Sequence, residues 1–569
     1  MKEKLITNKK VQVFIISIFI YVTLCFQDLL VPYNILSIFL FIIIYYAIYK
    51  TNLNHIYKKE FSIISLVLSI LLVLGRVLYN LRYDSVANSL NEFISIKSLI
   101  FIIGISSLIY VIFSIVLTKM IKYKSNTSNN INNVFMISFI IMFAVYLVYY
   151  LIYFPGILTG DSIDEINMIL GNVTLNDHHT IFHIIFLYIP FKVTSIFTNN
   201  INICVGVTTL MQVIIMSLIL AYSINYLYKR NTPKYILIGI ITYYALLPIN
   251  GFYSITLWKD IIFSLLIVLL TIECQKLIEK KNNITIKNSY TFIIISILAI
   301  LSRNNAIYMY IILALLTIII FRKRIITVLL MFIIIFSTYF TIKGPIYNYF
   351  NIKKSSTSEY IAIPLQQIGR MAYKNVKFTK YEETEINKVI PVSRLKELYS
   401  PEIVDPIKFD KEYNSKAFEK NKLKYLKLWL GLCIKHPAIA VESYLTSTLG
   451  YWYPGVEYWV TIDIIDENNL GIKNTSIVPK SIRNRFSKIR NSDIPLIGFT
   501  RCIGFCLWII FLLMYVAIKR NRKEVLYSFI PVVGIWITLL IATPVIAEFR
   551  YIYCAYLCLP VFIGLIYSK

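Results

Sequence analysis

Acidic and histidine side chains are concentrated just before residue 180. The segment 154–180 contains four acids, two adjacent histidines and no Lys or Arg: Asp161, Asp164, Glu165, Asp177, His178 and His179. Three of the protein's five histidines fall within six residues, since His183 follows. A carboxylate beside an imidazole suits proton abstraction. The simpler alternative is a solvated loop, which explains the acids but not the histidine cluster. We therefore take Asp161, Asp164, His178 and His179 as catalytic candidates.

Metal binding is a second use for the same residues. The D-x-x-D-E spacing that begins at Asp161, together with His178 and His179, could hold a divalent ion. A bare Asp/His cluster does not specify which metal, so the sequence leaves the metal open.

Cationic residues recur at the ends of apolar blocks. Lys259 opens one block, Arg303 lies in a tight turn between two, and Arg550 precedes the last. Ionisable residues at membrane depth are costly and mark candidate sites, although interfacial snorkelling is the alternative for any one of them. Three cations facing acidic residues would suit a phosphate leaving group. The substrate-binding candidates are Lys259, Asp260, Arg303, Glu548, Arg550 and Tyr551.

Long apolar blocks must position these residues. The chain has 569 residues, of which 57% are hydrophobic and only 15% charged, whereas soluble domains carry about 25% charged residues. Since a transmembrane helix needs about 20 apolar residues, we predict an all-α polytopic membrane protein with about 14 such helices. The predicted spans are 11–27, 33–49, 61–81, 97–117, 134–153, 204–228, 235–250, 257–275, 289–301, 305–321, 325–343, 500–518, 525–545 and 550–567.

The net charge of +27 sets orientation and does not indicate nucleic acid. Lys and Arg lie mostly in short connectors, which the positive-inside rule assigns to the cytoplasm. This assignment leaves 154–180 and 344–499 outside. The apolar stretch 181–197 must then begin and end outside, as a juxtamembrane or re-entrant helix.

The chain accordingly divides into four predicted segments. Residues 1–133 form an N-terminal four-helix extension, and 134–343 form a membrane core that includes the outer loop and the juxtamembrane helix. Residues 344–499 form an extracytoplasmic domain of mixed or mainly α structure, since they have a soluble composition and suffice for a small domain. Residues 500–569 form a three-helix C-terminal membrane segment.

Short motifs at these positions resemble the GT-C superfamily of membrane glycosyltransferases, and in particular a poorly characterised bacterial family. The matching motifs are Gly160-Asp161, Asp177-His178-His179, Asp260 and Arg550-Tyr551. The resemblance spans about 134–569 and includes a juxtamembrane helix at 181–197. Relatives commonly have Pro after the His, where this chain has Thr180.

The resemblance implies a multi-pass cell-membrane enzyme with its active site on the extracytoplasmic face. Its donor would be a polyprenyl-phosphate-linked sugar, and its acceptor a cell-surface polymer or glycolipid, with membrane lipid as a further partner. Asp161 would be the general base of an inverting transfer, and His178 and His179 would orient the acceptor or tune Asp161. The alternatives are a transporter or flippase of a lipid-linked glycan, and a purely structural role.

The topology is tested with single cysteines at Asn172 and Asn199, which flank 181–197. We expect a membrane-impermeant thiol reagent to label both from outside, because the segment does not cross. Labelling at 172 without labelling at 199 would make 181–197 a true span and contradict the orientation.

Overall fold

A computed structural model describes residues 2–26, 35–50, 57–124, 132–353, 361–476, 478–488 and 498–568. Across these ranges the chain is helical, and the only β-type pairings within them are isolated bridges. This confirms the all-α prediction. Parts of the expected domain 344–499, at 354–360 and 489–497, lie outside the described residues.

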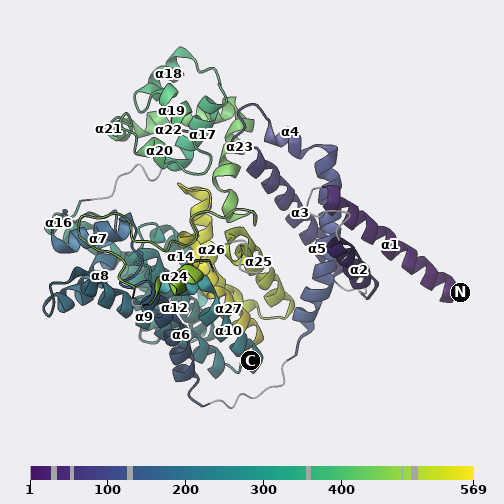
Figure 1. Cartoon of the computed structure of the whole chain (residues 1–569), viewed down its shortest axis with the longest axis horizontal. Helices are drawn as coiled ribbons and strands as arrows, with labels where there is room; N and C mark the ends of the chain where they lie inside the picture. Colours follow the sequence, from purple (N-terminus) through teal and green to yellow (C-terminus); the bar gives the residue numbers. More distant parts are fainter. Residues whose placement is uncertain are drawn as a thin grey trace. The chain divides into compact units, whose positions relative to one another are not determined.

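The chain forms two compact units (Figure 1). Unit 1 comprises 1–124, 362–456 and 544–546, and unit 2 comprises 125–361, 457–543 and 547–569. The helices of unit 1 are α1 (Lys2–Phe26), α2 (Ile35–Lys50), α3 (Lys58–Asn80), α4 (Ser89–Phe93), α5 (Ile96–Lys122), α17 (Ala362–Tyr373), α18 (Lys380–Asn387), α19 (Val392–Leu398), α20 (Asp405–Lys408), α21 (Ser415–Lys420), α22 (Lys422–Lys435) and α23 (Pro437–Ser447).

The helices of unit 2 carry the candidate site. They are α6 (Val134–Ile152), α7 (Gly160–Leu170), α8 (Ile181–Ser195), α9 (Ile201–Lys229), α10 (Lys234–Leu246), α11 (Pro248–Ser254), α12 (Lys259–Glu279), α13 (Tyr290–Ser302), α14 (Ala306–Ile320), α15 (Ile325–Thr341), α16 (Tyr347–Tyr349), α24 (Lys480–Lys488), α25 (Ile503–Lys519), α26 (Leu526–Ile541) and α27 (Tyr553–Tyr567).

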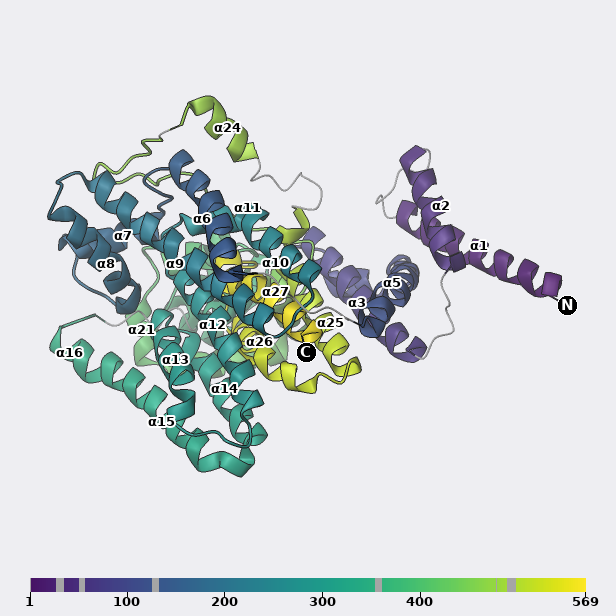
Figure 2. The same cartoon turned by 90° about the horizontal axis from the view of Figure 1, so that it is seen from below.

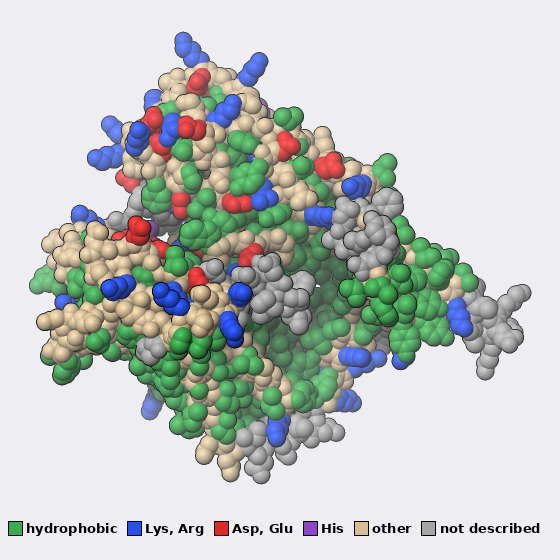
Figure 3. All heavy atoms as spheres, in the orientation of Figure 1, with side chains coloured by type: hydrophobic (Ala, Val, Ile, Leu, Met, Phe, Trp, Pro, Cys, Tyr) green, Lys and Arg blue, Asp and Glu red, His purple; other side chains and the backbone are tan. Residues whose placement is uncertain are grey.

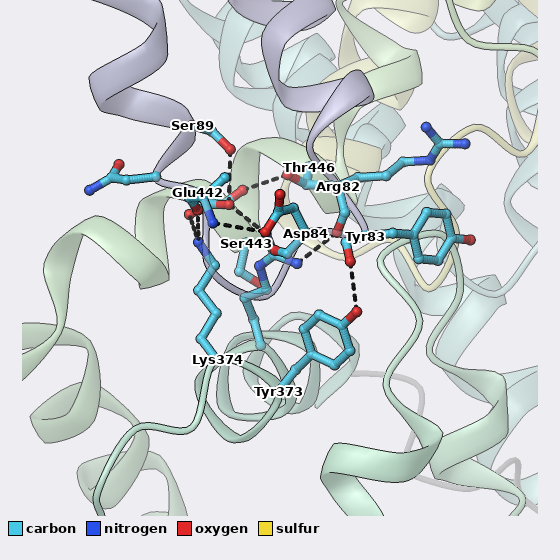
Figure 4. Close-up of polar contacts among 12 residues, drawn as sticks. Arg82, Tyr83, Asp84, Ser89, Tyr373, Lys374, Glu442, Ser443 and Thr446 are labelled. Carbon is cyan, nitrogen blue, oxygen red and sulfur yellow. Dashed lines mark hydrogen bonds and ion pairs between the residues drawn. The ribbon is translucent and has the colours of Figure 1, made fainter.

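This division differs from the four segments expected from sequence. The soluble-like stretch 344–499 is split, because 362–456 joins the N-terminal helices while 457–499 belongs with unit 2. A buried polar cluster explains the first of these associations (Figure 4). The buried Arg370 guanidinium donates to the Arg82 carbonyl at 2.6 Å and to Glu442 Oε1 at 2.6 Å. Lys374 Nζ donates to Glu442 Oε2 at 2.8 Å.

The same cluster contacts the turn between α3 and α4. Lys374 also donates to the Ala87 carbonyl at 2.7 Å, and Ser89 Oγ donates to Glu442 Oε1 at 3.0 Å. Buried charges are tolerated only when they are paired and hydrogen-bonded. The turn after α3 and the helices α17 and α23 must therefore lie on the same side of a membrane that α3 crosses.

Unit 2 is a helical bundle with α12 and α27 at its centre (Figure 2). Their most apolar stretches are 83% and 78% buried, against 33% for α6 and 22% for the segment that includes α15. Among the described residues, eight helices are long and apolar enough to cross a membrane, or nine if the bent pair α10–α11 counts as one span. Six shorter apolar helices accompany them. The chain is thus a multi-pass membrane protein by composition, and the count of about 14 stays a prediction.

The segment 154–180 was expected to be a loop, and this expectation was wrong for its middle part, which forms α7. Ile163, Ile166 and Ile169 recur every third residue and are buried in one apolar cluster with residues of α8 and α9. Gly171 then ends the helix in the left-handed region, with φ of 81°. The three-residue spacing was the signal of a helix, and it places Asp161 in the first turn.

Both ends of α8 lie at one end of the bundle. At its start, Thr180 Oγ1 donates to the Ser302 carbonyl at 3.1 Å. Just after it, the Lys473 amide donates to Asn202 Oδ1 at 3.1 Å, and residue 466 of the same 457–476 segment also contacts Gly160. This geometry fits a helix that begins and ends on one side, as the charge pattern indicates.

The cluster around Glu442 should be essential for the stability of unit 1. Glu442→Gln would remove the carboxylate charge to which the buried Arg370 and Lys374 are bonded, so we expect it to lower the free energy of unfolding by about 3–5 kcal/mol. Glu383→Gln, on the exposed face of α18, is the matched control and should change it by less than about 0.5 kcal/mol. Thermal unfolding in detergent measures both, and equal stabilities would contradict the assignment.

Candidate functional site

The first turn of α7 brings Asp161 to the last helix of the chain. Asp161 Oδ2 accepts a hydrogen bond from Arg550 Nη1 at 2.6 Å. The start of α7 is held in turn by Asp466, whose Oδ2 accepts from the Gly160 amide at 2.8 Å. A carboxylate at a helix N-terminus satisfies an amide that has no partner within the helix. The residues around Gly160 and Asp161 therefore have a fixed position.

The charges of Arg550 and Lys259 keep Asp161 ionised. Burial raises the pKa of this carboxyl, but Arg550 and Lys259 outweigh burial and hold its pKa well below its ordinary value. An ionised carboxylate can accept a proton, but a lowered pKa makes it a weak base while the Arg550 pair persists.

The histidine segment is organised by a carboxylate that the sequence did not single out. Glu165 is buried, and both of its oxygens lie 2.9 Å from His183 Nδ1. Its Oε1 is also 3.7 Å from His179 Nδ1. Glu165 thus lies between two imidazoles, where a carboxylate orients the rings.

His179 is poised as a neutral imidazole. Burial and the positive charge of Lys259 lower the pKa of His179 to about 4, against the opposing influence of Glu165 and Asp161. His179 Nε2 lies 4.0 Å from Asp164 Oδ2, and the Asp164 side chain is exposed to solvent. Burial and the charge of Asp161 raise the pKa of Asp164. His178 is exposed, and its carbonyl accepts from Lys259 Nζ at 2.9 Å.

A second buried cluster fixes the turn before these histidines. Asp177 Oδ1 lies 2.5 Å from Lys343 Nζ, which also donates to Asn304 Oδ1 at 2.7 Å. Asn304 Nδ2 donates back to the Asp177 carbonyl at 2.7 Å, and Tyr347 Oη donates to Asp177 Oδ1 at 3.1 Å. Three segments distant in sequence thereby position His178 and His179.

A further carboxylate lies deeper, at the start of α12. Asp260 is 1% exposed, and its Oδ1 lies 3.4 Å from Arg303 Nη1. Neither oxygen of Asp260 accepts a hydrogen bond from the described residues. Arg303 donates to the Tyr551 carbonyl at 2.7 Å and stacks over the Tyr551 ring at 4.5 Å. The pair is buried at a high desolvation cost, which is typical of functional sites.

Glu548 completes the charge cluster beside Arg550. Its Oε1 is 3.2 Å from Arg550 Nε, and the side chain is buried. Burial raises the pKa of Glu548 to about 7, helped by Asp260 and Asp161 and opposed by Arg550. Arg550 itself lies 5.0 Å above the Trp258 ring, a contact that steers its guanidinium.

All ten residues singled out from sequence lie in this one contact network. Asp161, His179, Lys259, Asp260 and Arg550 line a common narrow pocket with Glu165 and Trp258. The sequence reasoning missed Glu165, His183, Lys343, Asn304 and Asp466 as site residues. Glu165 was visible among the acids, but its burial and its pairing with His183 depend on the packing of α7 against α8.

The site offers one donor set for a metal ion. Ligand atoms of Asp161, His178 and His179 all lie within 4.8 Å of one another. Neutral imidazole and carboxylate suit Zn²⁺ or Mn²⁺. Arg550 and Lys259 are adjacent and would repel a divalent ion. The residues therefore fit only if Arg550 leaves Asp161, and a metal stays a prediction.

Comparison with known proteins places most of this network within one family. The model of the family described as "Family of unknown function (DUF6020)" matches residues 170–567, well over half of the chain. The chain belongs to the DUF6020 family. No curated protein and no solved structure matches the chain, so the resemblance to GT-C enzymes stays a prediction.

The DUF6020 match includes one side of the central ion pair and not the other. His178, His179, Lys259 and Arg550 lie within the matched residues, whereas Asp161 lies before residue 170. The DUF6020 region therefore supplies the cations and histidines of the site, and the first turn of α7 supplies the paired carboxylate.

The raised pKa of Glu548 should make stability depend on pH. The pKa of Glu548 is about 7 in the folded protein and about 4.3 in the unfolded chain. Proton binding by Glu548 therefore stabilises the fold, and this stabilisation is complete below about pH 4.3. It is lost as the pH rises through about 7. We expect the stability of the wild-type protein relative to Glu548→Gln to fall between about pH 5 and about pH 8, by on the order of 3 kcal/mol.

Thermal unfolding of both proteins at the two pH values measures this difference. Glu383→Gln on the exposed face of α18 is the control and should show no such pH dependence. A constant difference between wild-type and Glu548→Gln would show that Glu548 is ionised throughout.

Proposed function

We propose that this protein is a membrane glycosyltransferase that moves a sugar from a polyprenyl-phosphate donor to an acceptor hydroxyl on the outer face. The observation that carries the proposal is the Asp161–Arg550 pair, a carboxylate 2.6 Å from a guanidinium, in a pocket that Lys259 and His179 also line. Single displacement at a sugar needs one well-placed base and positive charge at the departing phosphate.

In the proposed reaction Asp161 removes the proton of the acceptor hydroxyl. The acceptor oxygen bonds to the anomeric carbon, and the bond from that carbon to the phosphate oxygen breaks. Its electron pair leaves with polyprenyl phosphate, and the configuration inverts. The neutral imidazole of His179, beside Asp161, would orient the acceptor hydroxyl.

The donor phosphate would activate the base by competing for Arg550. In the ion pair, Arg550 depresses the basicity of Asp161. A phosphate that binds Arg550 and Lys259 would draw the guanidinium away, and the pKa of Asp161 would rise toward its ordinary value. Glu548, on the other side of Arg550, would hold the guanidinium near the site. Donor binding and proton abstraction would thus be coupled through one residue.

Transport of a lipid-linked glycan is the second candidate, because one helix beside the site is broken. The helices α10 and α11 meet at an angle of 55°, and residues 255–258 connect α11 to α12, which begins at Lys259. Broken helices at a binding site are common in transporters. Against this, the charged residues of the site lie at the helix ends and not along the middle of the spans.

The proposal predicts different outcomes for the two members of the ion pair. Asp161→Asn keeps the shape but removes the base, so we expect transfer to fall by about 10²–10⁴-fold with donor binding little changed. Arg550→Ala should weaken donor binding as well as turnover, because phosphate contacts Arg550 in both ground and transition states. Mass spectrometry of surface glycans in a deletion strain that carries each variant measures transfer.

Asp164→Asn is the control within α7, since its side chain is 66% exposed, and it should cost less than Asp161→Asn. Loss of transfer with Asp164→Asn and not with Asp161→Asn would contradict the base. If neither variant altered any surface glycan or lipid-linked intermediate, transport would replace transfer as the function.

A further inference from the structure

Helix α24 is a short basic helix with an exposed cationic face. Its nine residues, KSIRNRFSK, contain four Lys or Arg and no acid. Lys480, Arg485 and Lys488 are exposed, and none of them makes an ion pair with another described residue. Along a helix these three cations share a face opposite Ile482 and Phe486. The helix is therefore amphipathic, with a cationic outer face.

Phe486, on the apolar side of α24, packs against the end of α6, a candidate membrane span. The Phe486 ring meets the Tyr149 ring edge-on, with ring centroids 5.4 Å apart. The Arg483 guanidinium lies 5.5 Å from the centroid of the Tyr153 ring. Tyr149 lies in the last turn of α6, and Tyr153 caps that helix. Because α6 is long and apolar enough to cross a membrane, its end is expected near the membrane–water interface.

Further contacts place α24 at the same end of unit 2 as the candidate site. Arg483 Nη1 donates to Asn474 Oδ1 at 2.9 Å, and the segment that contains Asn474 also includes Asp466, the residue bonded to Gly160. Figure 2 draws α24 near the ends of α6 and α7. Figure 3 shows Lys and Arg side chains in a row where Figure 1 draws this helix, with largely hydrophobic surface below them.

We propose that α24 lies in the headgroup layer on the site side of the membrane and binds the phosphates of anionic phospholipids. Charge complementarity argues for this occupant, because Lys480, Arg485 and Lys488 are exposed, form no ion pair with another residue that the structure describes, and have no acidic neighbour on the helix. Amphipathic helices with Lys and Arg on the polar face bind anionic membranes in this way. The proposal does not depend on a glycosyltransferase activity.

The test uses the full-length protein in nanodiscs of phosphatidylcholine alone or mixed with phosphatidylglycerol. A photo-crosslinking amino acid replaces Asn484, which lies on the cationic face between Lys480 and Lys488 and is exposed. We expect phosphatidylglycerol to be crosslinked more often than its fraction of the nanodisc lipid predicts. Each cation that binds a phosphate should raise this enrichment by about fivefold. The excess should shrink as salt is raised, because exposed charges are screened.

Charge reversal provides the matched comparison. K480E/R485E/K488E should reduce the crosslinked phosphatidylglycerol more than about tenfold. K420E/K422E/K427E reverses three exposed lysines at α21 and α22 and should leave it unchanged. Equal crosslinking to both lipids, no effect of the α24 reversal, or crosslinks to protein in place of lipid would each overturn the proposal.

Discussion

The ion pair between Asp161 and Arg550 is the interaction on which the arrangement of unit 2 depends. Its partners are 389 residues apart, and each comes from a helix end that other contacts hold in place. Asp466 fixes the start of α7, and Glu548 and Trp258 flank Arg550. A partly buried ion pair of this kind stabilises little by itself, since desolvation offsets its attraction. The pair instead fixes the geometry of the site, because it holds a carboxylate and a cation next to each other.

The remaining charges at this end of the bundle follow the same rule. Asp177 pairs with Lys343 and Asp260 pairs with Arg303. Glu165 lies 2.9 Å from His183 Nδ1. Each partner lies on a different helix or loop. Each of these charged side chains reaches its partner only when the helices that carry the two residues are packed together. The pKa of Glu548 near 7 and that of His179 near 4 are consequences of this crowding and burial.

Unit 1 shows the same physics in a structural role. Arg370, Lys374 and Glu442 form a buried network with backbone carbonyls of the turn after α3. No residue in it has a nucleophilic or acid–base geometry comparable to the candidate site. The network instead joins a helical domain to the N-terminal helices, which explains why 362–456 belongs with 1–124 and not with its sequence neighbours.

Composition and the length of the apolar blocks by themselves determined the all-α membrane class. Residue types and their positions at the ends of these blocks also predicted ten candidate site residues, which the structure places in one contact network. The reason is that the length of an apolar block, and the position of a charged residue at its end, can be read from neighbouring residues in the sequence. Only the tertiary structure decided the partners: that Arg550 pairs with Asp161, that Glu165 lies between His179 and His183, and that α7 replaces a loop. Those facts depend on contacts between segments far apart in sequence. The one local clue was the spacing of Ile163, Ile166 and Ile169, and its meaning became clear only when the structure placed these residues in one buried apolar cluster.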